Sequence, residues 1–497
     1  MEKNFNLSKI LSQNKYVIIV LFLFLISNLN SLFSIPRVMF DEPLYSYTAL
    51  KFLKTGSFYH DFFAFSGKEF CFYPFLLSLI YSIFGVSFEV GRLFSFLCGL
   101  ISFLFLFLYC KDNKYSDKLS AGILSIFLCS NILFVAYRII RPEALISVGL
   151  TGLILCLNNY LNNSKKLVKP FILYGIGASL GILFSTHLIG ALLSINIIFY
   201  FLIFLRKRLT INNIFKIIIG LLPFAILLGY NFFNQLLNHD LLNLIASSDK
   251  FNFSLETLSK NINTVLINNY IMGIKRIYIF IFEFIIITLA LIKARPGSLI
   301  KILNLSFLSF MIISFASINI FLRPYFILLV PILIIDLGFI FRNVKTSKRL
   351  IHFLFSLYLL NQLLGNAFIY KVNINNLSLS EINNQFDKLP DDSQYGGDVL
   401  FWFLKPSLNW LVAENINNFP EEIRKINSGK EIFWFHLPYP AYLNSSLSKE
   451  RSIFLSKETN IEKKVPLPNN IFKESSLVTS FSNPNFPEVE LWKTKIK

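Results

Sequence analysis

Charged side chains stand at four places where long apolar stretches of the chain begin or end. These are the pair Asp41-Glu42, the group Arg138, Arg141 and Glu143 in AYRIIRPEAL, His187 in FSTHLIGAL, and Arg323 with Tyr325 in FLRPYFILL. A carboxylate can accept the proton of an attacking hydroxyl group, and arginine binds phosphate through paired hydrogen bonds. Acids and arginines at one site therefore favour transfer from a phosphate-linked donor, whose anionic leaving group needs cations more than it needs an acid.

Each of these groups also has a simpler explanation. An acid after a first membrane span is most often solvated, a single arginine at the end of a span often anchors in the interface, and a lone histidine is typical of a helix end. A common site is favoured because four separate apolar segments place the charged groups at one predicted level of the membrane.

The apolar stretches that must position these groups are long enough to cross a bilayer. The chain has 497 residues, is 54% hydrophobic and is only 15% charged, against about 25% in soluble proteins. Since roughly 20 helical residues cross the hydrocarbon, we expect a polytopic α-helical protein with about eleven transmembrane helices. They are expected at residues 16–35, 92–110, 118–137, 142–158, 171–186, 188–205, 213–232, 274–293, 299–319, 323–341 and 350–368.

Basic residues in the loops predict the orientation of these helices. If the apolar stretch 70–87 lies along the membrane surface, the Lys/Arg-rich loops and the N-terminal lysines all fall on one side, which is then the cytoplasm. The first loop, 36–91, with its juxtamembrane helices, and the charged groups above then face outward.

The tail after residue 370 is expected on the same outer side. It is polar, and its apolar runs DVLFWFL and KEIFWFHL suit strands of a small α/β domain. We therefore expect a transmembrane domain at 1–369 and an extracytoplasmic domain at 370–497.

The net charge of +18 and the five cysteines do not indicate a nucleic acid partner, a disulfide framework or a zinc site. The positive charge is explained by the cytoplasmic loops, so we expect no nucleic acid partner. The cysteines lie in or beside apolar stretches without a C-x-x-C motif, so we expect packing residues, no disulfide framework and no structural zinc site.

Three runs of the sequence resemble one known group of proteins. They are D-E-x-x-Y-x-x-x-A-x-x-x-x-x-x-G from Asp41 to Gly56, YPFLLSLIYSIFG from Tyr73 to Gly85, and GRLFSFLCGL from Gly91. They resemble the membrane glycosyltransferases of the GT-C class, in the branch of the protein mannosyltransferases and aminoarabinose transferases (glycosyltransferase families 39 and 83). RPEAL and RPYFILLVP resemble later motifs of that branch, so the resemblance extends over roughly residues 16–340.

The resemblance implies roles for individual residues. Asp41 would be the catalytic carboxylate and the base for the acceptor, Glu42 would assist or position it, and Glu143 would be a second acid. Candidates for binding the donor phosphate are Arg92, Arg138, Arg141, His187, Arg323, Tyr325 and Lys68. Many relatives read Lys-Pro-Pro where this chain has Phe72-Tyr73-Pro74, so the lysine that contacts the phosphate is missing at that position. Lys68 is included as a nearby lysine that could replace it. No metal ligand set is expected, although the sequence leaves a role for a divalent cation open.

The resemblance also implies the reaction. A sugar on a polyprenyl phosphate, undecaprenyl or dolichyl, would pass with inversion to a hydroxyl group of a glycan, lipid or protein outside the cytoplasm. Composition suggests a bacterial inner-membrane protein surrounded by membrane lipids. The alternative is a transporter or flippase for a polyprenyl-linked glycan, although transporters usually carry internal repeats and polar midplane residues. A catalytically inert scaffold would leave the gathering of acids and arginines unexplained.

Overall fold

The structure is a computed structural model of the 497-residue chain. The residues that it describes are 13–33, 41–58, 70–162, 169–206, 209–237, 255–263, 277–317, 327–343, 348–373, 394–397, 402–403, 406, 411–412, 431–436, 472–483 and 486–496.

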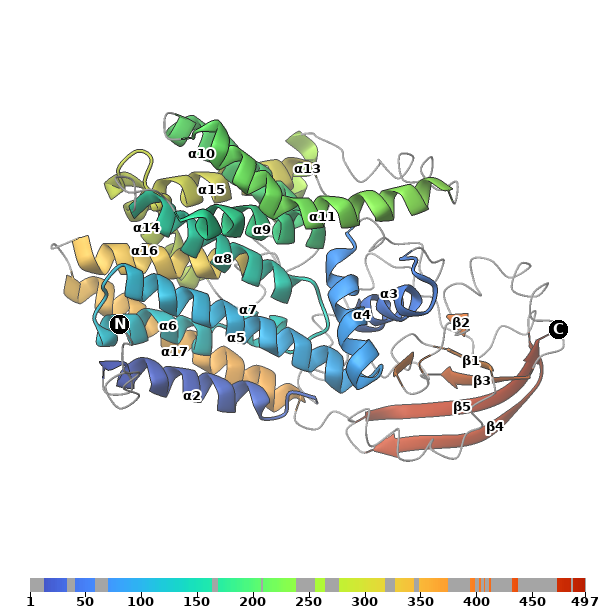
Figure 1. The fold of residues 1–497 in the computed structure, drawn as a ribbon. Helices are drawn as coiled ribbons and strands as arrows, with labels where there is room; N and C mark the ends of the chain where they lie inside the picture. Colours follow the sequence, from blue (N-terminus) through green and yellow to red (C-terminus); the bar gives the residue numbers. More distant parts are fainter. Residues whose placement is uncertain are drawn as a thin grey trace.

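Long apolar helices packed side by side make up most of the molecule (Figure 1). Each predicted span overlaps a helix or a pair of helices. These are α2 (Lys15–Leu29), α5 (Phe88–Asp112), α6 (Asp117–Cys129) with α7 (Asn131–Ala136), α8 (Glu143–Asn162), α9 (Pro170–Thr186), α10 (Leu188–Leu205), α11 (Ile211–Leu237), α14 (Ile277–Lys293), α15 (Leu299–Ser317), α16 (Leu329–Asn343) and α17 (Lys348–Asn373). A short helix, α13 (Leu255–Asn261), lies between α11 and α14.

Not all of these helices are long enough to cross a membrane on their own. In the described part of the chain, six helices have the length and hydropathy for a crossing, namely α5, α8, α10, α11, α15 and α17. The helices α2 and α9 are apolar but shorter. The number of eleven crossings therefore stays a prediction.

The predicted span 118–137 is interrupted at Ser130. Its backbone is extended (φ −61°, ψ 117°), which ends α6, and its hydroxyl oxygen accepts from the amide of Leu133 at 3.4 Å to cap α7. A serine at this position satisfies an amide that a helix start leaves without a partner. Because α7 ends at Ala136, the chain reaches the basic residues at 138 and 141 through turns rather than along a helix.

Two helices occupy the predicted first outer loop, α3 (Asp41–Thr55) and α4 (Phe72–Phe84). The helix α4 has one buried face and one exposed apolar face: Tyr73 and Tyr81 are buried, whereas Ile83 and Phe84 are 73% and 71% exposed. That pattern fits the predicted surface helix, although the position of the bilayer stays a prediction. The helix ends at Gly85, whose φ of +82° is unfavourable for residues with a side chain.

Glycines allow α9 and α11 to pack at very close range. A Cβ atom added to Gly177 would lie 2.0 Å from the carbonyl oxygen of Ile217, and one added to Gly220 would lie 2.2 Å from that of Tyr174. Small residues permit such approach of two backbones within a membrane. This contact therefore fixes α11 against the rest of the bundle.

The described part of the tail forms a five-stranded mixed sheet. Its strands are β1 (Gln394–Gly397), β2 (Leu411–Val412), β3 (Glu431–His436), β4 (Phe472–Asn483) and β5 (Phe486–Ile496), in the order β2-β1-β3-β5-β4. The strand β1 is parallel to β2 and β3, with Gln394 opposite Ile432, and β5 is antiparallel to β3 and β4. The sheet lies at the end of the bundle beside α3 (Figure 1).

The two strand predictions for the tail have different outcomes. KEIFWFHL is confirmed, since β3 runs through it from Glu431 to His436. DVLFWFL is wrong at Trp402 and Phe403, because β1 ends at Gly397 and these two aromatic residues form a 3-10 turn whose side chains are buried against helices. The apolar run reflects that burial. No α-helix occurs among the described residues after 373, so the α/β character of the tail stays a prediction.

Candidate active site

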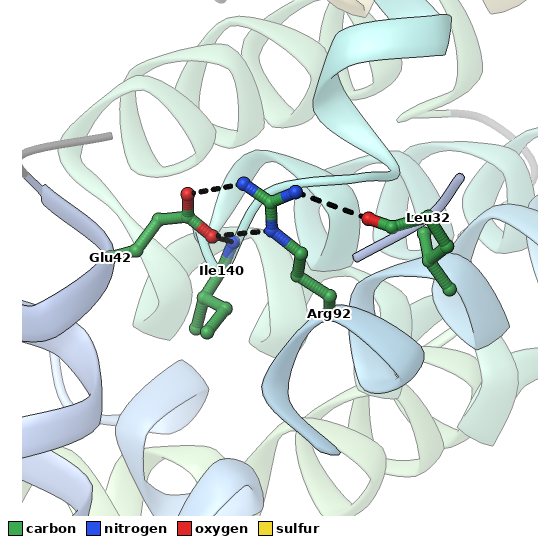
Figure 2. Close-up of polar contacts among 4 residues, drawn as sticks. All are labelled: Leu32, Glu42, Arg92 and Ile140. Atoms are coloured by element: carbon green, nitrogen blue, oxygen red, sulfur yellow. Dashed lines mark hydrogen bonds and ion pairs between the residues drawn. The ribbon is translucent and has the colours of Figure 1, made fainter. Parts of the chain in front are cut away.

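Glu42 and Arg92 form a fully buried ion pair (Figure 2). Nε of Arg92 donates to Oε2 of Glu42 at 3.1 Å and Nη2 donates to Oε1 at 2.8 Å, and both side chains are 0% exposed. The main chain completes the network: Arg92 Nη1 donates to the Leu32 carbonyl at 3.1 Å, and the Ile140 amide donates to Glu42 Oε2 at 3.0 Å. Because a buried charge is tolerated only when it is paired and hydrogen-bonded, this network joins α3, α5 and the segments that follow α2 and α7.

Arg141 binds two carboxylates, one on each side. Its Nη1 atom lies 2.7 Å from Oδ2 of Asp41, while Nε and Nη2 donate to the two oxygens of Glu143 at 3.1 and 2.7 Å. Arg141 and Glu143 are almost fully buried, but the side chain of Asp41 is 33% exposed. Asp41 is thus held in place by an arginine and still reaches the surface of the site.

The electrostatic surroundings of Asp41 suit a base. Burial raises the pKa of Asp41 above its ordinary value of 3.8; Arg141 lowers it, and Glu143 and Glu42 raise it further. For Arg141, burial opposes the charged form, but the two carboxylates outweigh burial and raise its pKa. Asp41 is therefore a stronger proton acceptor than a solvated aspartate, and its partner Arg141 stays charged.

Helix starts place these acids where their charge is stabilised. Asp41 and Glu42 lie in the first turn of α3, and Glu143 lies in the first turn of α8. Unpaired amides and the helix dipole favour negative charge at that end. Pro43 in the first turn of α3 supports the helix start, since no intrahelical donor is needed there.

Aromatic and hydroxyl side chains attach α3 to its neighbours. The hydroxyl groups of Ser46 and Tyr81 lie 2.9 Å apart and join α3 to α4, and the rings of Tyr45 and Tyr73 meet edge to face at 5.6 Å. Tyr73 also contacts Ser95 of α5 through its hydroxyl group at 3.3 Å. The helix that begins with Asp41 therefore has little freedom to rotate.

Arg138 holds the end of α2 rather than a carboxylate of the site. Its Nη2 atom donates to the carbonyl groups of Ser27 and Asn30, the latter at 3.2 Å, and its guanidinium lies 3.9 Å from the ring centre of Phe134. The residue is 0% exposed. Arg92 and Arg138 were predicted to bind the donor phosphate, but both guanidinium groups are buried against protein groups, which favours a role in positioning.

His187 caps α10 and is neutral. Its Nδ1 atom accepts from the amide of Ile189 at 3.3 Å, and its ring stacks on that of Phe70. Burial lowers the pKa of His187 to about 4, with Glu143 acting against burial and Arg141 acting with it. As a neutral group it can contribute a hydrogen bond, but it cannot supply the positive charge for a phosphate.

The structure thus brings together Asp41, Glu42, Arg92, Arg141 and Glu143 and places Arg138 and His187 around them, and the catalytic and phosphate-binding roles predicted for these residues stay predictions. Lys68, Arg323 and Tyr325 lie outside the described residues. The main-chain partners Leu32 and Ile140 were missed, because nothing in a side chain signals that its backbone will bind a charge. Among the described residues, no three His, Cys, Asp or Glu side chains gather as a metal site.

Comparison with known proteins identifies a similar family and similar structures. The family model of the dolichyl-phosphate-mannose-protein mannosyltransferases matches residues 71–230. ArnT from Cupriavidus metallidurans bound to undecaprenyl phosphate is similar over 96% of this chain and 97% of that chain, with a TM-score of 0.62 and 12% identity. Its apo state is similar over the same shares, with a TM-score of 0.60 and 13% identity. A search of curated proteins gave no match.

The predicted resemblance to GT-C glycosyltransferases is confirmed by these findings. At 12% identity the structural likeness establishes the fold alone. The matched range 71–230 contains Arg92, Arg141 and Glu143, while Asp41 and Glu42 lie before it. The roles of these five residues are therefore argued from geometry.

Proposed function

We propose that this chain is a GT-C glycosyltransferase that moves a sugar from a polyprenyl-phosphate donor to a hydroxyl acceptor outside the cytoplasm. The mannosyltransferase family model supports sugar transfer. The undecaprenyl phosphate bound to the structurally similar ArnT supports a polyprenyl-phosphate donor. The distribution of basic loops supports the outer side of the membrane.

The observation that carries the proposal is the different exposure of three carboxylates. The side chain of Asp41 is 33% exposed, whereas those of Glu42 and Glu143 are 0% and 2% exposed and bind arginine through both oxygens. A general base must reach the proton that it removes. Asp41 meets this requirement, and its raised pKa makes it the better acceptor.

The reaction proposed at Asp41 is a single displacement. The carboxylate takes the proton of the acceptor hydroxyl, whose oxygen forms a bond to the anomeric carbon. The bond from that carbon to the phosphate oxygen breaks, and its electron pair leaves with the polyprenyl phosphate. Attack opposite to the leaving group inverts the anomeric centre.

The other residues have supporting roles in this proposal. Arg141 orients Asp41 and is itself held by Glu143, while Glu42 and Arg92 fix the start of α3. The anionic leaving group still needs cations. We assign the positive charge to Lys68 and Arg323 and a hydrogen bond from its hydroxyl group to Tyr325, since the described guanidinium groups at 92 and 138 are occupied.

An Asp41→Asn variant tests the proposed reaction. Membranes that contain the protein are supplied with radiolabelled undecaprenyl-phosphate sugars, and the labelled acceptor and free undecaprenyl phosphate are measured. We expect transfer by the unmodified protein and a loss of at least about 10²-fold in Asp41→Asn, in the range of a lost general base. Equal transfer by a variant of equal abundance would refute the assignment.

The same assay in sealed vesicles distinguishes the transporter alternative. A transporter would move the labelled lipid across the bilayer without breaking its sugar–phosphate bond, so intact donor would be recovered. A transferase leaves free undecaprenyl phosphate. The lipid-linked sugar that accumulates in cells lacking the protein would identify the natural donor.

A further inference from the structure

Two neighbouring aromatic residues connect the C-terminal sheet to the helices of the active site. Trp402 and Phe403 form a turn that follows β1, and they are 0% and 8% exposed. The ring of Trp402 meets Tyr47 at 6.1 Å, the ring of Phe403 meets Phe88 at 5.2 Å, and both contacts are edge to face. We call this pair of residues the aromatic wedge.

The first contact of the wedge is with the helix that begins with Asp41. Tyr47 lies on α3 and is 6% exposed, within a buried run that extends from Glu42 to Leu50. Aromatic pairs prefer edge-to-face or offset-stacked arrangements, and the planes of these two rings meet at 66°. Trp402 therefore adds to the contacts of Tyr45 and Ser46 that limit rotation of α3 about its axis. Such a rotation would turn Asp41 away from the substrate.

The second contact reaches the same helix start by another path. The guanidinium of Arg92 lies 4.1 Å from the ring centre of Phe88, whose ring also contacts Phe403. Arg92 in turn holds both oxygens of Glu42. Phe403, Phe88, Arg92 and Glu42 thus form a continuous series of contacts that ends beside Asp41.

We propose that the aromatic wedge is a positioning element through which the C-terminal domain sets the orientation of Asp41. One of its contacts is with α3 six residues after Asp41, and the other reaches Glu42 through Phe88 and Arg92. The inference rests on the proposed function. A misplacement of about 1 Å in a catalytic group can lower a rate by about 10²-fold, so loss of the wedge lowers the rate of transfer per folded molecule.

A purely structural role for Trp402 gives a different result. It would lower the amount of folded protein and leave the turnover of each folded molecule unchanged. Turnover must therefore be measured on the full-length protein after removal of unfolded material, and donor binding must be measured separately with undecaprenyl phosphate as the probe.

Three variants make the test. Trp402→Ala removes the contact with Tyr47, and Trp402→Phe keeps an aromatic ring there. Phe282→Ala removes a ring that is 4% exposed and packs on Phe355 and Tyr358 of α17. We expect Trp402→Ala to lower kcat by about 10- to 10²-fold with little change in undecaprenyl phosphate binding, Trp402→Phe to restore most of it, and Phe282→Ala to lose stability but keep kcat.

The outcomes separate this inference from the proposed function. If Trp402→Ala keeps the kcat of the unmodified protein while Asp41→Asn loses transfer, the positioning role is refuted and the proposed function stands. If Asp41→Asn keeps transfer, the proposed function itself fails. Should Trp402→Ala yield no folded protein, Trp402→Leu replaces it, because it retains apolar volume without a ring edge and is judged by the same kcat criterion.

Discussion

Asp41 and Glu42 are adjacent acids, but replacing the carboxylate by an amide should affect a different property of the protein at each position. Glu42→Gln should lower the stability of the protein severely. Asp41→Asn should leave stability nearly unchanged and lower transfer by at least about 10²-fold. The difference follows from the exposure of the two side chains and from what each one binds.

The magnitude for Glu42 follows from its buried contacts. Its carboxylate accepts from Nε and Nη2 of Arg92 and from the amide of Ile140. A glutamine presents an NH₂ group to one of these donors and leaves the guanidinium, which is 0% exposed, without a counter-charge. Removing one partner of a buried ion pair costs about 3–5 kcal/mol.

The magnitude for Asp41 is smaller because its side chain is partly exposed and its arginine has a second carboxylate partner. The side chain is 33% exposed and makes one contact with Arg141 at 2.7 Å. Because Arg141 keeps both hydrogen bonds to Glu143, losing the charge of Asp41 should cost only about 1 kcal/mol. Asparagine also retains an oxygen that can accept from the arginine.

Denaturant unfolding of the purified variants in detergent micelles, followed by the transfer assay on the folded fraction, checks both values. The double variant Glu42→Gln, Arg92→Met serves as a control, since removing both charges should recover part of the stability that the single change loses. A Glu42→Gln protein within about 1 kcal/mol of the unmodified one would show that the buried pair does not hold the site together.

Two further predictions concern pH and packing. A base works in its deprotonated form, so transfer should fall as the pH decreases toward the pKa of Asp41, which lies above its ordinary value of 3.8. Arg141 lowers this pKa, so the variant Arg141→Gln should lose transfer at a still higher pH. Matching pH–rate profiles for the two proteins would contradict this. Gly177→Ala should lower stability by about 1–3 kcal/mol, because its Cβ would meet a main-chain oxygen of α11 at 2.0 Å, whereas Gly122→Ala, with nothing within 4 Å, should not. Equal unfolding curves for the two glycine variants would argue against the close contact between α9 and α11.

Much of the helical fold could be predicted because long apolar runs leave little choice of structure in a membrane. The run predicted at 92–110 is the core of α5, which extends from Phe88 because Ser87 caps it, its hydroxyl accepting from Val90 at 3.2 Å. The break at Ser130 was missed, since a single serine within an apolar run resembles an ordinary helix residue. Hydropathy identifies which segments are buried, but local hydrogen bonds decide where each helix ends.

The sequence predicted which acids and arginines gather near one another, but it did not predict which of them form ion pairs. Orientation of the spans brought Asp41 and Glu143 to one level, and the structure joins them through Arg141. The pairing of Glu42 with Arg92 depends on main-chain groups whose positions are set by the whole bundle. Trp402 was predicted to lie in a strand, because an apolar run has the same appearance whether it packs within a sheet or against helices.

The order in which the buried pair is synthesised has a consequence for membrane insertion. Along the chain, Leu32 lies 60 residues and Glu42 lies 50 residues before Arg92. Ile140 comes after all three, 98 residues after Glu42. An unpaired arginine is costly within a bilayer, and Arg92 lies near the start of α5. Glu42 and Leu32 have left the ribosome before α5 does, so the charge can be neutralised as that helix enters the membrane. The later arrival of Ile140 adds its amide to the network.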